Sequence, residues 1–223
     1  MRTYRLSTRE RILNAAEQLF AQHGHQNTTM RQITSTAEVN LSAVNYHFGS
    51  KDALIQAVFK RRLHAINDER LQILEELERE AMGAPIKPSQ IVEGFFGPLV
   101  RHALADGRGK KAFLPLLERS TSDPADFIQA IFDDEHASVF DRYKEALFLA
   151  LNDVPEEEII WRFHFMLGSV SYALMGTEQL RHTLRLAQPE IDEAEENRLL
   201  HARLMSFLLG GLRAPLPLPV STS

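Results

Sequence analysis

The chain has 223 residues, of which 44% are hydrophobic and 25% charged, and it contains no cysteine. This composition is that of a soluble globular protein with room for one small and one larger domain. The lack of cysteine excludes disulfides, thiolate zinc sites and cysteine nucleophiles, and it is compatible with a reducing cytoplasm. The first residues lack the apolar segment of a signal peptide. We therefore expect a cytoplasmic protein.

The net charge of −5 is unevenly spread along the chain. Residues 1–51 carry six Lys and Arg against three Asp and Glu, whereas residues 52–223 carry 19 against 27. A basic N-terminal segment followed by an acidic chain suits a protein that contacts phosphates with one end only.

Capping motifs define the first two expected helices. Ser7 and Glu10 fit a capping box at the start of the first helix, which Gly24 is expected to end. Thr29 and Gln32 have the same spacing and predict the start of the second helix.

A short third helix is expected to follow a tight turn. Asn40 is suited to cap it and Gly49 to end it. Leu41, Val44 and Phe48 fall on its apolar side. Two short helices joined by a turn are typical of a helix-turn-helix, whose second helix enters the major groove of DNA.

The rest of the chain also has helical periodicity, without the alternation that would indicate strands. A long helix is expected from Lys51 to about Met82, and residues 83–88 break it. Further helices are expected at about 89–106, 111–121, 124–151, 156–176 and 190–212. We therefore expect an all-α fold of about nine helices: a helix-turn-helix domain (1–51), a ligand-binding and dimerisation domain (52–213) and a disordered Pro-rich tail (214–223).

The outer face of the third helix carries side chains suited to DNA. Asn45 can pair with adenine through two hydrogen bonds, while Ser42 and Ala43 suit a base edge or a thymine methyl. Thr29 and Lys51 lie in the first turns of their helices, where an anion is favoured. The candidate DNA-binding residues are Thr29, Arg31, Ser42, Ala43, Asn45, Tyr46, His47 and Lys51. The structural alternatives are Asn40 as a cap only, Tyr46 covering the core, His47 as a plain surface residue and Arg31 on a solvated face.

Residues 8–55 resemble the N-terminal domain of the TetR family of bacterial repressors. The resemblance rests on RERILNAAEQLFAQHG, TTMRQIT and YHFGSKDALI. It implies a three-helix DNA-binding domain, an all-helical ligand-binding body and a dimer. It also implies phosphate contacts at Thr29, Tyr46, His47 and Lys51, and groove contacts at Ser42, Ala43 and Asn45. Two residues depart from the family pattern: Glu38 stands where Gly is usual, and Asn45 where Tyr is more common.

The middle of the chain is rich in phenylalanine, whose default role is core packing. Ligand sites in helical bundles lie between helices and are lined by such side chains. The candidate ligand-binding residues are Phe95, Phe96, Leu99, Phe113, Leu117, Phe127, Ile131, Phe140 and Tyr143. Arg101, His102, Arg119 and Arg142 are candidates for the polar end of a long apolar effector, with surface charge as the alternative. The sequence also resembles the fatty-acid-responsive, PsrA-type branch of the family, which implies a long-chain fatty acid or acyl-CoA.

The longest apolar stretch, residues 159–175, is interrupted by Arg162 and His164. It is short for a membrane span, which needs about 20 apolar residues. We expect it to pair with residues 199–209 in a four-helix dimer interface, because two DNA-binding heads must span half-sites about one helical turn apart. The candidate interface residues are Phe163, Met166, Leu167, Val170, Leu174, Leu204 and Leu208.

These features predict a repressor, without cofactor or catalytic residues, that an apolar effector releases from a palindromic operator. An effector-independent DNA-binding protein is one alternative. A helical metalloenzyme is another, since residues 133–136 form a dense group of potential ligands. That group lacks the paired Glu-x-x-His pattern of di-iron bundles.

Overall fold

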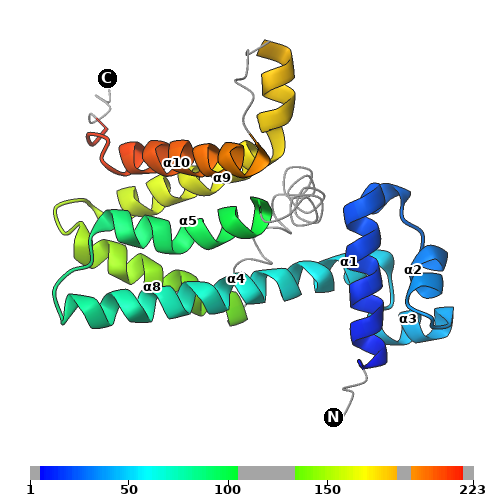
Figure 1. Cartoon of the computed structure of the whole chain (residues 1–223). Coiled ribbons are helices and arrows are strands. Elements are labelled where there is room, and N and C mark those ends of the chain that lie inside the picture. Colours follow the sequence, from blue (N-terminus) through cyan, green and yellow to red (C-terminus); the bar gives the residue numbers. More distant parts are fainter. Residues whose placement is uncertain (1–5, 105–133, 185–191, 218–223) are drawn as a thin grey trace, which may run out of the picture. The chain divides into compact units, whose positions relative to one another are not determined.

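The computed structural model describes residues 6–104, 134–184 and 192–217, and every regular element in these ranges is a helix (Figure 1). The all-α expectation is confirmed. Contacts divide the chain into two compact units. We call Met1–Asn67 with His102–Ile131 the N-terminal unit, and Asp68–Arg101 with Phe132–Ser223 the C-terminal unit.

The N-terminal unit contains α1 (Thr8–Asn27), α2 (Met30–Thr36), α3 (Leu41–Phe48) and the first part of α4 (Lys51–Ala81). The predicted caps are present. The Ser7 hydroxyl accepts from the Glu10 N–H at 3.2 Å, and the Glu10 carboxylate accepts from the Ser7 N–H at 2.8 Å. The α1 helix is interrupted at Gly24, where φ is 73°.

Apolar side chains from these four helices and the α2–α3 turn form one core. Because α2 and α3 each have two turns or so, neither can bury an apolar face alone, and both pack on α1. The buried residues of this core are Ile12, Leu13, Ala15, Ala16, Leu19, Phe20, Ile33, Ala37, Val44, Leu54, Ile55, Val58, Phe59 and Leu63.

The turn between α2 and α3 contains a non-glycine residue in the left-handed region, Glu38, with φ of 53°. A side chain there costs about 1–2 kcal/mol through contact of Cβ with the following carbonyl. This conformation explains why Gly is the usual residue at this place in the TetR pattern.

Glu38→Gly is expected to raise the free energy of unfolding by about 0.5–1 kcal/mol, because the relieved strain exceeds the extra entropy of glycine in the unfolded chain. Urea denaturation checks this. The matched control is Glu38→Ala, which removes the same charge but keeps Cβ, and should give no such gain. Equal stabilisation by both variants would show that the charge, not the backbone, is responsible.

The C-terminal unit contains the rest of α4, with α5 (Pro88–Leu104), α8 (Asp134–Ala150), α9 (Glu156–Leu184) and α10 (Glu193–Leu212). Both α8 and α10 pack on α9. The α9 helix continues past the end expected near residue 176, because an internal glycine costs only about 1 kcal/mol and does not stop a packed helix. The expected helix at 111–121 lies outside the described residues. Within the described ranges, no helix is long and apolar enough to cross a membrane.

Candidate nucleic-acid interface

The α3 helix lies on the surface of the N-terminal unit with one side anchored in the core. Val44 is fully buried, whereas Ser42 and Asn45 are exposed and Tyr46 is 86% exposed. The Asn40 side chain accepts a hydrogen bond from the Ala43 N–H at 2.8 Å, which fixes the start of the helix. The cap, the buried Val44 and the partly buried Phe48 thus leave the other side of α3 facing solvent.

Helix N-termini flank this exposed face. The Thr29 hydroxyl accepts from the Gln32 N–H at 3.3 Å and lies 2.8 Å from Gln32 Oε1, to which it donates. Lys51 opens α4 behind Ser50, whose hydroxyl accepts from the Ala53 N–H at 3.0 Å. Free N–H groups in such first turns favour an anion.

All eight candidate DNA-binding residues lie at the surface of this one unit. Ala43 and Lys51 are half-buried, and the other six are exposed: Thr29, Arg31, Ser42, Asn45, Tyr46 and His47. The α3 helix and the starts of α2 and α4 supply them.

Leu41 does not lie where the sequence pattern placed it. We expected it on the apolar side of α3 with Val44 and Phe48, but its side chain is 51% exposed and takes no part in the core. The expectation was wrong: Leu41 is the first residue of the helix, and Val44, about one turn later, is the residue that α3 buries in the core.

An ion-pair cluster that the sequence did not predict ties α1 to α4. Glu17 pairs with both Arg61 and Arg62, and Arg61 also donates to the Asn14 side chain at 2.7 Å. These residues are more than 40 positions apart, so no local pattern indicates the contact. The cluster helps to hold the start of α4 against the helix that supports α3.

The C-terminal unit holds a cluster of five aromatic rings, drawn from α5, α8 and α9. The Phe95 ring centroid lies 4.8 Å from that of Phe163, 5.0 Å from Phe96 and 5.2 Å from Tyr143. Phe140 completes the cluster at 5.1 Å from Phe163. Of the candidate ligand-binding residues, Phe95, Phe96 and Tyr143 are buried and Leu99 and Phe140 half-buried; Phe113, Leu117, Phe127 and Ile131 lie outside the described residues.

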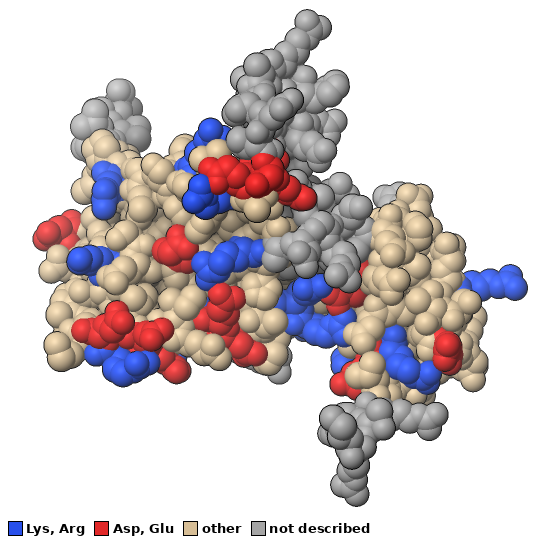
Figure 2. All heavy atoms as spheres, in the orientation of Figure 1, with Lys and Arg blue, Asp and Glu red and all other residues tan. Residues whose placement is uncertain are grey.

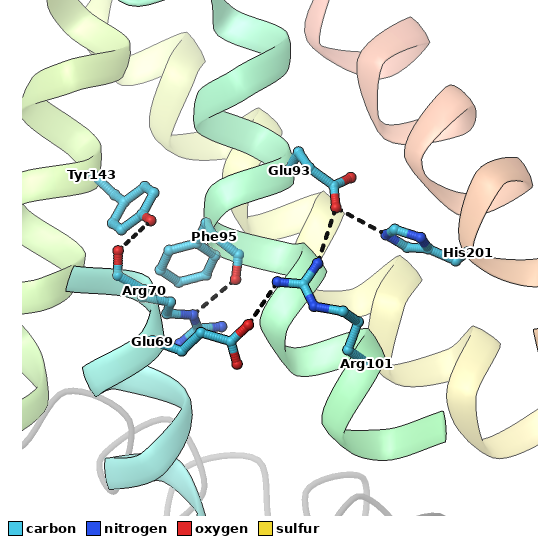
Figure 3. Close-up of polar contacts among 7 residues, drawn as sticks. All are labelled: Glu69, Arg70, Glu93, Phe95, Arg101, Tyr143 and His201. Atoms are coloured by element: carbon cyan, nitrogen blue, oxygen red, sulfur yellow. Dashed lines mark hydrogen bonds and ion pairs between the residues drawn. The ribbon is translucent and has the colours of Figure 1, made fainter. Parts of the chain in front are cut away.

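A buried arginine that the sequence did not single out lies against this cluster. The Arg70 guanidinium stacks on the Phe95 ring at 3.8 Å, and its Nε donates to the Phe95 carbonyl at 2.8 Å (Figure 3). The Tyr143 hydroxyl donates to the Arg70 carbonyl at 2.8 Å. Burial lowers the pKa of Arg70 to about 9 and raises that of Tyr143. At neutral pH the Arg70 side chain is therefore a cation that lies against the ring cluster, and the Tyr143 phenol within the cluster is neutral.

The arginines expected at the polar end of an effector are engaged at the surface instead. Arg101 bridges Glu69 at 2.8 Å and Glu93 at 3.3 Å, and His201 lies 3.1 Å from the same Glu93 oxygen (Figure 3). Arg142 pairs with two glutamates of α4. Basic and acidic side chains accordingly lie beside one another over this unit in Figure 2.

Arg119 lies outside the described residues, as does Asp133 of the possible metal group, and the side chains of residues 134–136 are likewise not described.

The predicted dimer-interface residues are mostly internal. Leu167 is half-buried, and the other six are buried within the single chain: Phe163, Met166, Val170, Leu174, Leu204 and Leu208. In the single chain these six side chains pack into the interior. The interface assignment stays a prediction; because α9 is apolar nearly all round, its pattern does not distinguish the inward face from the outward one.

Five large apolar side chains of α9 and α10 are exposed to solvent. We call this set the outer aromatic stripe: Ile160, Trp161, Phe165 and Tyr172 of α9, with Phe207 of α10. Phe165 is 61% and Tyr172 69% exposed. An added Cβ at Gly168, Gly210 or Gly211 would meet nothing within 4 Å. The stripe is thus bordered by open backbone.

A small three-helix unit with a capped, outward-facing third helix is a helix-turn-helix of the major-groove type. Residues 12–58 match the family model described as "Bacterial regulatory proteins, tetR family", and residues 93–211 match "Tetracyclin repressor-like, C-terminal domain". The second match covers more than half of the chain. The protein therefore belongs to the TetR family of transcriptional regulators.

Individual relatives agree with this assignment. The HTH-type transcriptional regulator UidR of Escherichia coli (strain K12) is 31% identical over 114 residues, which cover 45% of this chain and 58% of UidR. The structure of a putative TetR-family regulator from Shewanella sp. PV-4 has a TM-score of 0.58 at 18% identity, covering 91% of this chain and 98% of that one. Thermus thermophilus FadR in complex with lauroyl-CoA has a TM-score of 0.55 at 21% identity, covering 94% and 98%. At these identities the two structures establish the fold alone.

Proposed function

We propose that the protein is a repressor that binds a palindromic operator as a homodimer through α3 and is released by an amphipathic effector with a long apolar part. The observation that carries the proposal is the exposed polar face of α3, held by the Asn40 cap and the buried Val44. DNA binding is supported by the type of side chain on this face. Asn45 offers an amide for adenine, and Lys51, Tyr46 and His47 offer donors for phosphate oxygens.

The outer aromatic stripe supports the homodimer. The Trp161 and Phe165 rings of this set lie 5.8 Å apart between centroids, and neighbouring exposed apolar side chains often mark an interaction site. A two-fold axis through the stripe brings the same residues of two copies together, as an isologous interface requires. The open backbone at Gly168 and Gly210 allows the helices to approach closely.

The aromatic cluster supports an apolar effector. Its rings join α5, α8 and α9, so a ligand lodged among them contacts three helices at once. The fold is shared with Thermus thermophilus FadR, whose structure contains lauroyl-CoA. An acyl-CoA or fatty acid is therefore the effector class that we propose.

Release requires that the effector bind better to a conformation that does not match the operator. The α4 helix contributes residues to both units, Lys51 to the N-terminal unit and Arg70 to the C-terminal unit. A shift of this helix on effector binding therefore moves the start of α4, beside α3. A coupling of about 1–3 kcal/mol changes DNA affinity 5–150-fold.

The test is binding of the purified protein to its own promoter region by fluorescence anisotropy, over a range of salt concentrations, with and without lauroyl-CoA, oleoyl-CoA or oleic acid. Tight, salt-sensitive binding that an acyl-CoA or the acid weakens supports the proposal. Binding that no lipid changes contradicts the effector class and leaves an effector-independent DNA-binding protein. No specific binding to any upstream region contradicts the proposal as a whole.

A further inference from the structure

Leu41 is an exposed leucine at the start of the helix proposed to enter DNA. It follows the N-cap Asn40 directly and is 51% exposed. The apolar side chains packed against the core of the N-terminal unit include Val39 and Phe48 on either side of it, but not Leu41. Leu41 therefore adds apolar area to the surface of the unit.

Helical geometry gives Leu41 the same face as the amide expected to pair with a base. Successive residues are turned by about 100°, so Leu41 and Asn45 lie one above the other, about 40° apart. Ser42 and Tyr46 continue this exposed face, while Val44 points into the core. In helix-turn-helix proteins the N-terminal residues of this helix contact base edges.

We propose that Leu41 contacts the 5-methyl group of a thymine next to the base pair bound by Asn45. Thymine alone of the four bases presents a methyl group in the major groove, and apolar side chains contact it. Leucine has no donor for a phosphate or a base edge, so the methyl group is the feature of the groove that it fits. This inference rests on the proposed DNA-binding function and adds to it a specificity-determining residue and an A·T-containing half-site.

The expected effect is small but selective. Removing one methyl-sized contact weakens binding about fourfold, and two half-sites together give about fifteenfold. Deoxyuridine removes this methyl group without changing base pairing. At one thymine position, wild-type protein should therefore bind the thymine duplex more tightly than its deoxyuridine counterpart, whereas Leu41→Ala should bind both alike at that position.

The experiment uses the full-length protein and a duplex selected by it from a pool of random sequences. The duplex is resynthesised with deoxyuridine in place of thymine, first at every thymine and then one position at a time. Anisotropy gives the ratio of the two Kd values for wild type, Leu41→Ala and the matched control Leu6→Ala, which removes a leucine of the same unit that is 50% exposed. The control should keep the wild-type ratio.

The outcomes separate this inference from the proposed function. Selection of a preferred duplex, with a ratio that Leu41→Ala alone abolishes, supports the contact. A preferred duplex that wild type binds equally with thymine or deoxyuridine overturns the contact and leaves DNA binding intact. If Leu41→Ala keeps the wild-type ratio of the two Kd values at that thymine, another residue contacts the methyl group, and the proposed contact is overturned as well. Failure to select any preferred duplex contradicts the DNA-binding function and this inference with it.

Discussion

Phe165→Asp is expected to convert the proposed dimer to a monomer and to weaken operator binding at least about 100-fold. The Phe165 side chain is exposed in the single chain between Trp161 and Tyr172. In a symmetric interface the new carboxylates of both copies would be buried without a partner, at a cost of several kcal/mol. About 2.8 kcal/mol already corresponds to 100-fold in affinity.

Sedimentation equilibrium measures the mass of the protein in solution, which distinguishes monomer from dimer. Fluorescence anisotropy measures the affinity for DNA. The matched control is Leu149→Asp, which places the same charge at a 70% exposed leucine at the end of α8, outside the outer aromatic stripe. The control should remain a dimer. A dimeric Phe165→Asp protein would show that the two copies meet through another surface.

Asn45→Ala is expected to weaken binding to the preferred operator by about 30-fold to 10⁴-fold while leaving the fold intact. One bidentate contact to adenine contributes about 1–3 kcal/mol of discrimination, and a dimer makes it twice. The slope of log affinity against log salt should not change, because Asn45 releases no counterion. Lys51→Ala should instead reduce that slope by about one per protomer, if it contacts one phosphate.

Salt titrations on the preferred duplex and on random DNA distinguish these two roles. Asn45→Ala should lose affinity for the preferred duplex only, and Lys51→Ala for both. Asn152→Ala, at an exposed asparagine between α8 and α9, is the control and should bind like wild type. Equal loss on both duplexes for Asn45→Ala would place Asn45 at the DNA backbone rather than at a base.

The N-terminal unit was largely predictable because its signals are local. Thr29 with Gln32, and Asn40 with Ala43, make capping bonds between residues three apart, so spacing alone locates these helix starts. Local spacing did not indicate where Leu41 points. Burial at this position depends on which distant segments pack around α3, and residues near Leu41 in the sequence do not show this.

The C-terminal unit was less predictable because its contacts are long-range. Arg70 and Tyr143 are 73 positions apart, and only the packing of α8 against α4 and α5 brings the phenol to the Arg70 carbonyl. The helix α9 is apolar on both sides, so its sequence does not show which side packs against α10. The structure assigns Phe163 and Val170 to the interior and Phe165 to the surface.

The sequence by itself determined the helical class, the positions of the short N-terminal helices and their caps, and the identity of the polar side chains on α3. Each of these depends on residues within one or two turns of each other. The tertiary structure alone decided that Leu41 faces solvent, that a buried arginine stacks on Phe95, and which face of α9 is exposed. The physical reason is that burial depends on what packs against a helix, and the periodicity of a helix that is apolar all round does not specify its neighbour.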